Sequence, residues 1–192
     1  MRSLTNYLLF QIGWFTCVSR AAEGDMWTGP LAVLVITALH LLIVVRPSER
    51  RWELGYILSI GLVGMLADTG LGLAGATQYP SSEAAWASAL APPWITALWM
   101  LFGTMPHHSL SWLAERPGLA VVLGALGGPL AFLGGVRFGA VAHGESAVLT
   151  YFALALEYAI LTPLMLRFAR HRLGNEAPSL EDGLASEADV NL

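Results

Sequence analysis

The chain alternates long apolar runs with short polar connections, and the length of the runs sets the expected fold. A transmembrane α-helix needs about 20 mainly apolar residues to cross a hydrocarbon core of about 30 Å. Six segments approach this length, so the pattern predicts an all-α protein, a polytopic membrane protein built as a bundle of six transmembrane helices. The expected spans are Leu4–Arg20, Thr28–Val45, Leu54–Gly75, Pro92–Leu113, Gly118–Ala140 and Ser146–Phe168.

The composition supports the membrane class. Of the 192 residues, 55% are hydrophobic and 12% are charged, and the mean hydropathy is +0.58. Soluble domains have about 25% charged residues. All ten basic residues are arginines spread over the connections, so no basic patch indicates a nucleic-acid partner. The expected partner is the lipid bilayer itself.

The placement of the arginines predicts the orientation. With the N-terminus in the cytoplasm, eight arginines lie on the inner side and two, Arg20 and Arg137, lie on the outer side. Cytoplasmic connections carry the excess of positive charge, so we expect an N-in/C-in topology. Residues 1–172 form the expected transmembrane domain. Residues 173–192 contain five acidic residues and no aromatic one, which is typical of a disordered, here cytoplasmic, acidic tail.

Two spans carry stripes of glycine. Positions three and four residues apart lie on one face of a helix, and small residues there let helices approach closely in lipid. The third and fifth spans are therefore expected to be inner helices. The stripes are Gly61, Gly64, Asp68, Gly72 and Gly75 in the third span, and Gly124, Gly128, Ala131, Gly135 and Gly139 in the fifth.

Polar and ionisable residues within the spans are the candidate site. An ionisable residue there costs about 2.5–3.5 kcal/mol on insertion scales, so its presence indicates a function. At about 1.5 Å rise per residue, the carboxylates and the glutamine lie near the midplane, and the histidines lie about 5–8 Å toward the inside. The expected catalytic residues are His107, His108, Asp68 and Glu157, and the expected binding residues are Gln11, His40 and Arg137.

Histidine titrates near neutral pH, so His107 or His108 is the expected acid–base group, with Asp68 or Glu157 as its partner. Neighbours on a helix project about 100° apart, so the two histidines are not expected to face one centre. Two other roles stay open. A carboxylate paired with a histidine or an arginine also serves as a structural tie, and Arg137 also fits an arginine that reaches the headgroups.

A metal site made from His40, one histidine of the pair and a carboxylate is chemically feasible. However, neither H-x-x-x-H nor H-E-x-x-H spacing occurs in the sequence, so no metal site is predicted. The sequence also lacks a P-loop, a G-x-S-x-G and a C-x-x-C motif, and the cofactor stays unknown.

Four stretches carry a family resemblance: Asn6–Val18, the GMLAD sequence ending at Asp68, Ala91–Leu113 and Gly127–Ala140. Over about residues 5–170 the chain resembles an uncharacterised family of small bacterial inner-membrane proteins, known only as a domain of unknown function. Its members are often encoded near a cyclopropane-fatty-acid-synthase-like enzyme and a flavin amine-oxidase-like protein. The resemblance therefore implies a bacterial inner (plasma) membrane location and lipid-modifying enzymes as partners. It supplies no catalytic residues.

Three functions follow from these observations. The first is an accessory protein or enzyme of membrane fatty-acid or lipid modification, with a polar pocket inside the bundle. The second is a small proton-coupled carrier that uses Asp68 and Glu157 as a relay. The third is a non-catalytic membrane scaffold that binds partners through its glycine faces. The gene neighbourhood of the family favours the first.

Overall fold

The structure, a computed structural model, describes residues 2–80 and 90–175, and these parts are all-helical apart from two short strands. The last helix continues to residue 175, and the rest of the predicted tail, 176–192, lies outside the described residues. The elements in chain order are α1 (Arg2–Ala22), α2 (Thr28–Leu39), the π-helical turn η1 (His40–Val44), α3 (Arg50–Leu73), β1 (Thr77–Gln78), α4 (Pro93–Gly103), the 3-10 turn η3 (Ser111–Leu113), α5 (Pro117–Phe138), β2 (Ala142–His143) and α6 (Ala147–Asn175).

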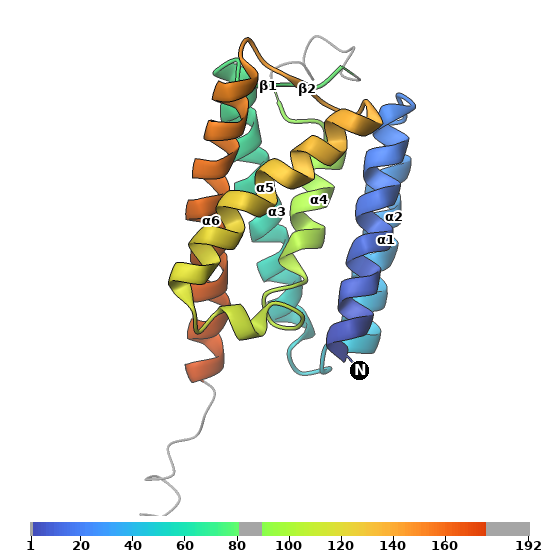
Figure 1. Cartoon of the computed structure of the whole chain (residues 1–192). Coiled ribbons are helices and arrows are strands. Elements are labelled where there is room, and N and C mark those ends of the chain that lie inside the picture. Colours follow the sequence, from blue (N-terminus) through green and yellow to red (C-terminus); the bar gives the residue numbers. More distant parts are fainter. Residues whose placement is uncertain (1, 81–89, 176–192) are drawn as a thin grey trace, which may run out of the picture.

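The helices form a bundle in which one helix crosses the others obliquely. Helices α1 and α2 pack together, as do α3 and α4, while α5 packs along α6 and passes in front of α4 (Figure 1). At one end of the bundle β1 pairs antiparallel with β2, with Thr77 opposite His143. The N-terminus and the end of α6 both lie at the other end (Figure 1).

The outer surface of the bundle is that of a membrane protein. Within the described residues, three helices are long and apolar enough to cross a membrane: α3, α5 and α6. Helix α2 with η1 and helix α4 are apolar but shorter, and α1 has the length but is more polar. The outward faces are apolar even on the shorter helices, because Leu31, Leu34 and Val35 of α2 are each more than half exposed. Water-soluble monomers rarely expose such continuous apolar surface.

The fourth predicted span, Pro92–Leu113, is wrong as a continuous helix. Helix α4 ends at Gly103, and residues 104–110 form turns that lead into η3. Pro106 explains the break, since proline lacks an N–H, its ring collides with the preceding helical turn, and it disfavours helical backbone one residue earlier. Eleven residues rise about 16 Å, so α4 extends through only about half of a hydrocarbon core.

The glycine stripes lie where helices meet only in part: Gly61, Gly64, Gly124 and Gly128 face a neighbouring helix, whereas Ala131 and Gly139 are exposed. A Cβ atom placed on Gly64 of α3 would overlap the indole of Trp99 on α4. In the same way, a Cβ atom on Gly128 of α5 would overlap the ring of Tyr158 on α6. These glycines therefore allow large aromatic rings to pack directly on the backbone of the neighbouring helix.

We expect Gly64→Ala to destabilise the fold by about 1–3 kcal/mol, the usual cost of overpacking a filled interior. Gly70 is the matched control on the same helix, because it is exposed and nothing lies within 4 Å of its added Cβ. Gly70→Ala should be neutral or stabilise the helix by about 0.5–1 kcal/mol. Unfolding in detergent micelles gives the free energy of unfolding of each variant. Equal values for the two variants would contradict close packing of Trp99 on Gly64.

Candidate functional site

The first candidate site surrounds Glu53, a carboxylate buried in the first turn of α3 at 3% exposure. On one side, the Nε2 atoms of His40 and His108 lie 3.1 and 3.6 Å from its Oε1 atom. On the other side, the Nδ1 atom of His107 lies 2.9 Å from Oε2. A buried charge is tolerated only where polar groups compensate it. These four side chains form one unit, which we call the Glu53 cluster.

Irregular backbone brings the three histidines together. His40 begins the π-helical turn that follows α2, in which the N–H of Val45 donates to the carbonyl of His40 over 3.2 Å. His107 and His108 lie in the turns after α4 and not on a helix. The expectation that these two side chains could not face one centre was therefore wrong, because it assumed helical geometry at both positions.

Asn6 of α1 links the cluster to the turns that follow α4. Its Nδ2 donates to the carbonyl of Thr104 at 3.0 Å, and its Oδ1 accepts from the hydroxyl of Ser109 at 2.6 Å. This orients the amide so that Nδ2 faces the Nδ1 atom of His40 at 3.3 Å. With Nδ1 as acceptor, the proton of a neutral His40 ring lies on Nε2 and is donated to Glu53.

The other two histidines lie near the carboxylate without completing hydrogen bonds. His107 donates from Nε2 to the carbonyl of Ala169 on α6 at 3.3 Å. Its Nδ1 atom and the Nε2 atom of His108 have no hydrogen-bond partner among the described residues, although both atoms are buried. Their short distances to Glu53 are thus not matched by hydrogen-bond angles. Chemically, two buried imidazole nitrogens remain available for a proton or a cation.

The second candidate site surrounds Asp68, four helical turns further along α3. The indole N–H of Trp99 donates to Oδ2 at 2.6 Å, and the hydroxyl of Tyr79 donates to Oδ1 at 2.9 Å. Burial, together with the nearby charge of Asp68, raises the pKa of Tyr79 far above its usual value, so its hydroxyl keeps the proton that it donates. Each oxygen of the buried Asp68 carboxyl therefore has a donor.

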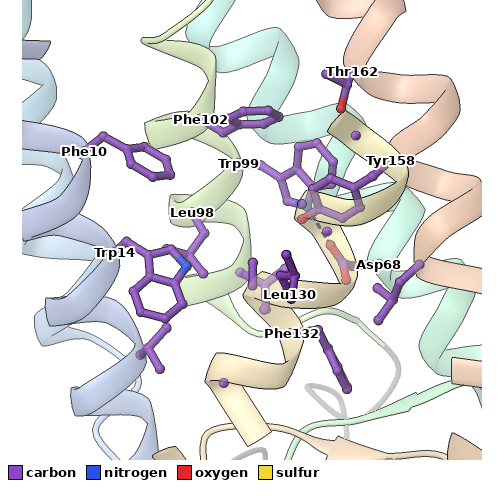
Figure 2. A pocket seen from close by; sticks show the side chains of 18 of the residues that line it. Phe10, Trp14, Asp68, Leu98, Trp99, Phe102, Leu130, Phe132, Tyr158 and Thr162 are labelled. Carbon is purple, nitrogen blue, oxygen red and sulfur yellow. Dashed lines mark hydrogen bonds between the residues drawn. The ribbon is translucent and has the colours of Figure 1, made fainter. Parts of the chain in front are cut away.

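A cavity of about 510 Å³ lies against this second site, between α1, α4, α5 and α6. Figure 2 shows Phe10 and Trp14 of α1 on one side of the cavity, with Asp68, Trp99 and Tyr158 close together on the other. The rings of Trp99 and Tyr158 stack with centroids 5.0 Å apart. Most of the lining is apolar or aromatic, so Asp68 contributes the main charge.

The remaining predicted site residues have separate positions. Gln11 lines the cavity, half-buried on α1. The carboxyl oxygens of Glu157 on α6 are buried without a hydrogen-bond partner among the described residues, and they lie close enough to Asp68 to interact electrostatically. Arg137 is exposed in the last turn of α5, where a positive charge complements the helix dipole.

The structure divides the predicted site into two. The carboxylate next to His40, His107 and His108 is Glu53 and not Asp68 or Glu157. Glu53 and Asp68 are separated along α3 by about 22 Å, since fifteen residues each rise about 1.5 Å. The sequence analysis missed Glu53 because it lies one residue before the expected third span. Its depth, level with the histidines at the inner end, is the signal that could have found it.

Comparison with known proteins identifies the family. The chain matches the family described as "Protein of unknown function (DUF2878)" over residues 3–164, which is most of its length, and it belongs to that family. No curated protein and no solved structure matches it. The chain is thus a helical membrane protein of a family whose function is not established.

Trp99→Phe should destabilise the fold by about 1–3 kcal/mol, because it leaves a buried carboxylate oxygen without its donor. Trp94 on the same helix is the matched control: it is equally buried, and its indole N–H has no partner among the described residues. Trp94→Phe loses no hydrogen bond and should cost less. Unfolding in detergent micelles compares them, and a larger loss for Trp94→Phe would refute the importance of the bond to Asp68.

Proposed function

We propose that this protein binds a fatty-acyl chain of a membrane lipid in the cavity beside Asp68 and serves membrane fatty-acid or lipid modification, as an accessory protein or an enzyme. The observation that carries the proposal is the apolar cavity of about 510 Å³ with one buried carboxyl on its wall. Ligand sites are usually cavities of about 300–1,000 Å³, mainly apolar, with a few placed polar groups.

The proposal includes the topology: six spans in the bacterial inner membrane, with both termini in the cytoplasm. The common position of the N-terminus and the end of α6 (Figure 1) supports it, as does the excess of arginine at that side. Helix α1 supports it as well, since Leu4, Leu8 and Ile12 are each at least half exposed and form an apolar outer face. A face of this kind fits lipid better than water.

The cavity reaches the outer surface of the bundle through residues that lipid would contact. Phe15 of α1 and Leu130 of α5 line the cavity and are 50% and 64% exposed. An acyl chain can therefore enter sideways from the bilayer between α1 and α5 without leaving an apolar environment. Once inside, its polar or unsaturated part would lie near Asp68, with the Tyr79 hydroxyl fixed beside it.

Cross-linking tests the acyl-binding proposal. The purified chain is placed in phosphatidylethanolamine and phosphatidylglycerol vesicles that contain a diazirine-labelled palmitoyl lipid, and labelled residues are mapped by mass spectrometry. We expect labels on cavity residues such as Phe10 and Phe132. Leu98→Trp fills the cavity and should reduce this labelling at least several-fold, because the indole occupies the space of the chain. Leu62→Trp, on the outer face of α3, is the control and should leave it unchanged.

Two results would count against the proposal. Labels confined to outward positions such as Leu62, or cavity labelling unaffected by Leu98→Trp, would show that no acyl chain enters. The metabolic role is tested separately in a deletion strain and its complemented counterpart. A phospholipid acyl-chain profile identical to wild type under every stress tested would remove the role in lipid modification.

A proton-coupled carrier is the second candidate, and the buried, unpaired carboxyl of Glu157 near Asp68 is the observation that favours it. If the two carboxyls relay protons, Asp68→Asn and Glu157→Gln should each abolish proton flux into liposomes, since an amide cannot carry the proton. Glu145→Gln, in the loop before α6, serves as the control. Wild-type flux equal to that of empty liposomes would remove this candidate.

The non-catalytic scaffold has less support, because Gly128 and Gly135 contact side chains of their own chain and are not free to bind a partner.

A further inference from the structure

We propose that the Glu53 cluster is a binding site for a divalent transition-metal ion of the zinc class. This inference does not depend on the proposed lipid function, because the cluster lies about 22 Å from Asp68 along α3. Its ligands would be Glu53, His40 and His108, while His107 lies at the other carboxylate oxygen and helps to orient it.

The donor atoms are close enough to share one ion. One nitrogen each of His40 and His108 and one oxygen of Glu53 lie within 4.8 Å of one another. In a tetrahedral zinc site, bonds of about 2.0–2.1 Å place neighbouring ligand atoms about 3.3 Å apart. The two nitrogen–oxygen distances of 3.1 and 3.6 Å lie on either side of this value. The two histidine nitrogens, which lie within 4.8 Å of each other, must approach to a similar distance, so binding requires a movement of the side chains.

The missing hydrogen bonds point to a ligand in the same place. The Nε2 atom of His108 and the Nδ1 atom of His107 are buried and make no hydrogen bond within the described residues, although they lie 3.6 and 2.9 Å from oxygens of Glu53. Buried polar atoms in folded proteins are nearly always paired. An ion bound beside Oε1 of Glu53 would satisfy the Nε2 atom of His108 and the carboxylate together.

The groups behind the histidines determine how each ring could bind a metal ion. A ligating histidine usually donates its other N–H to a carbonyl or a carboxylate, and the Nε2 atom of His107 donates to the carbonyl of Ala169. For His40, binding through Nε2 moves the ring proton to Nδ1. A proton on Nδ1 faces the Nδ2 donor of Asn6, so metal binding requires the Asn6 amide to turn over and give up its hydrogen bond to the carbonyl of Thr104.

The donor set selects the class of ion. Imidazole nitrogen and carboxylate suit Zn²⁺ and its first-row neighbours, whereas Ca²⁺ and Mg²⁺ prefer oxygen alone. A hollow of about 410 Å³ lined by His107, Ser111, Glu115 and Arg170 reaches the cluster at His107. The sequence did not predict the site, because local spacing reveals histidines on one helix and these donors come from separate segments.

The test uses the full, tag-free chain in detergent micelles, stripped with a chelator, with Zn²⁺ and Co²⁺ as the probes. We expect one Zn²⁺ per chain by titration calorimetry and elemental analysis. Co²⁺ should give the intense visible absorption of a four-coordinate site. Glu53→Gln and His108→Gln should each weaken Zn²⁺ binding at least 10-fold, since loss of even an outer partner typically costs about 10–100-fold.

His143 provides the matched control, because it pairs with Tyr151 at the opposite end of the bundle. His143→Gln should bind Zn²⁺ like the wild type. The proposal is overturned if the wild type takes up less than half an equivalent of Zn²⁺, or if His108→Gln and His143→Gln bind it equally. Should Glu53→Gln fail to fold, as judged by size-exclusion chromatography, the His108 variant decides, since its side chain is partly exposed at 15%.

Discussion

The burial of the Glu53 carboxylate is the constraint on which the end of the bundle that carries the N-terminus depends. An ionised side chain removed from water costs several kcal/mol unless partners compensate it, and removing one partner of a buried pair costs about 3–5 kcal/mol. Here the partners come from three separate places: the end of α2, the turns after α4 and, through Asn6, helix α1. None of these segments can move alone without exposing a charge to an apolar interior. The cluster thus holds four parts of the chain together where regular helix has ended.

Helix α3 carries the carboxylates of both candidate sites, so the other helices are arranged around it. At one end Glu53 gathers histidines, and at the other Asp68 accepts hydrogen bonds from Trp99 and Tyr79. Between them the glycine face lets α4 lie directly on α3. Helix α5 packs on α6 instead and crosses α4 obliquely (Figure 1). The space that remains between them is the cavity.

Sequence patterns predicted the features that depend on residues close together along the chain. Most of the helices, part of the glycine faces and the burial of Asp68 follow from periodicities along one segment, and the structure confirms these. The partners of each polar residue did not follow, because Trp99 and His107 meet α3 only through the tertiary fold. Pro106 lies inside the fourth span, which the hydropathy pattern nevertheless predicted as one continuous helix. By ending the helix, it turned two divergent side chains toward one carboxylate. Glu53 was missed because hydropathy places the edge of a span only to within a few residues.

The short helix α4 also constrains how the protein is made. An isolated segment of eleven apolar residues is too short to enter a bilayer as a spanning helix on its own. The non-helical residues that follow it, 104–110, are acceptable at membrane depth only when other parts of the protein satisfy their backbone. We therefore expect α4 to enter the membrane together with α3, already docked through Trp99 and Asp68. The biosynthetic unit is then a helical hairpin, and the order of insertion follows from the position of a single proline.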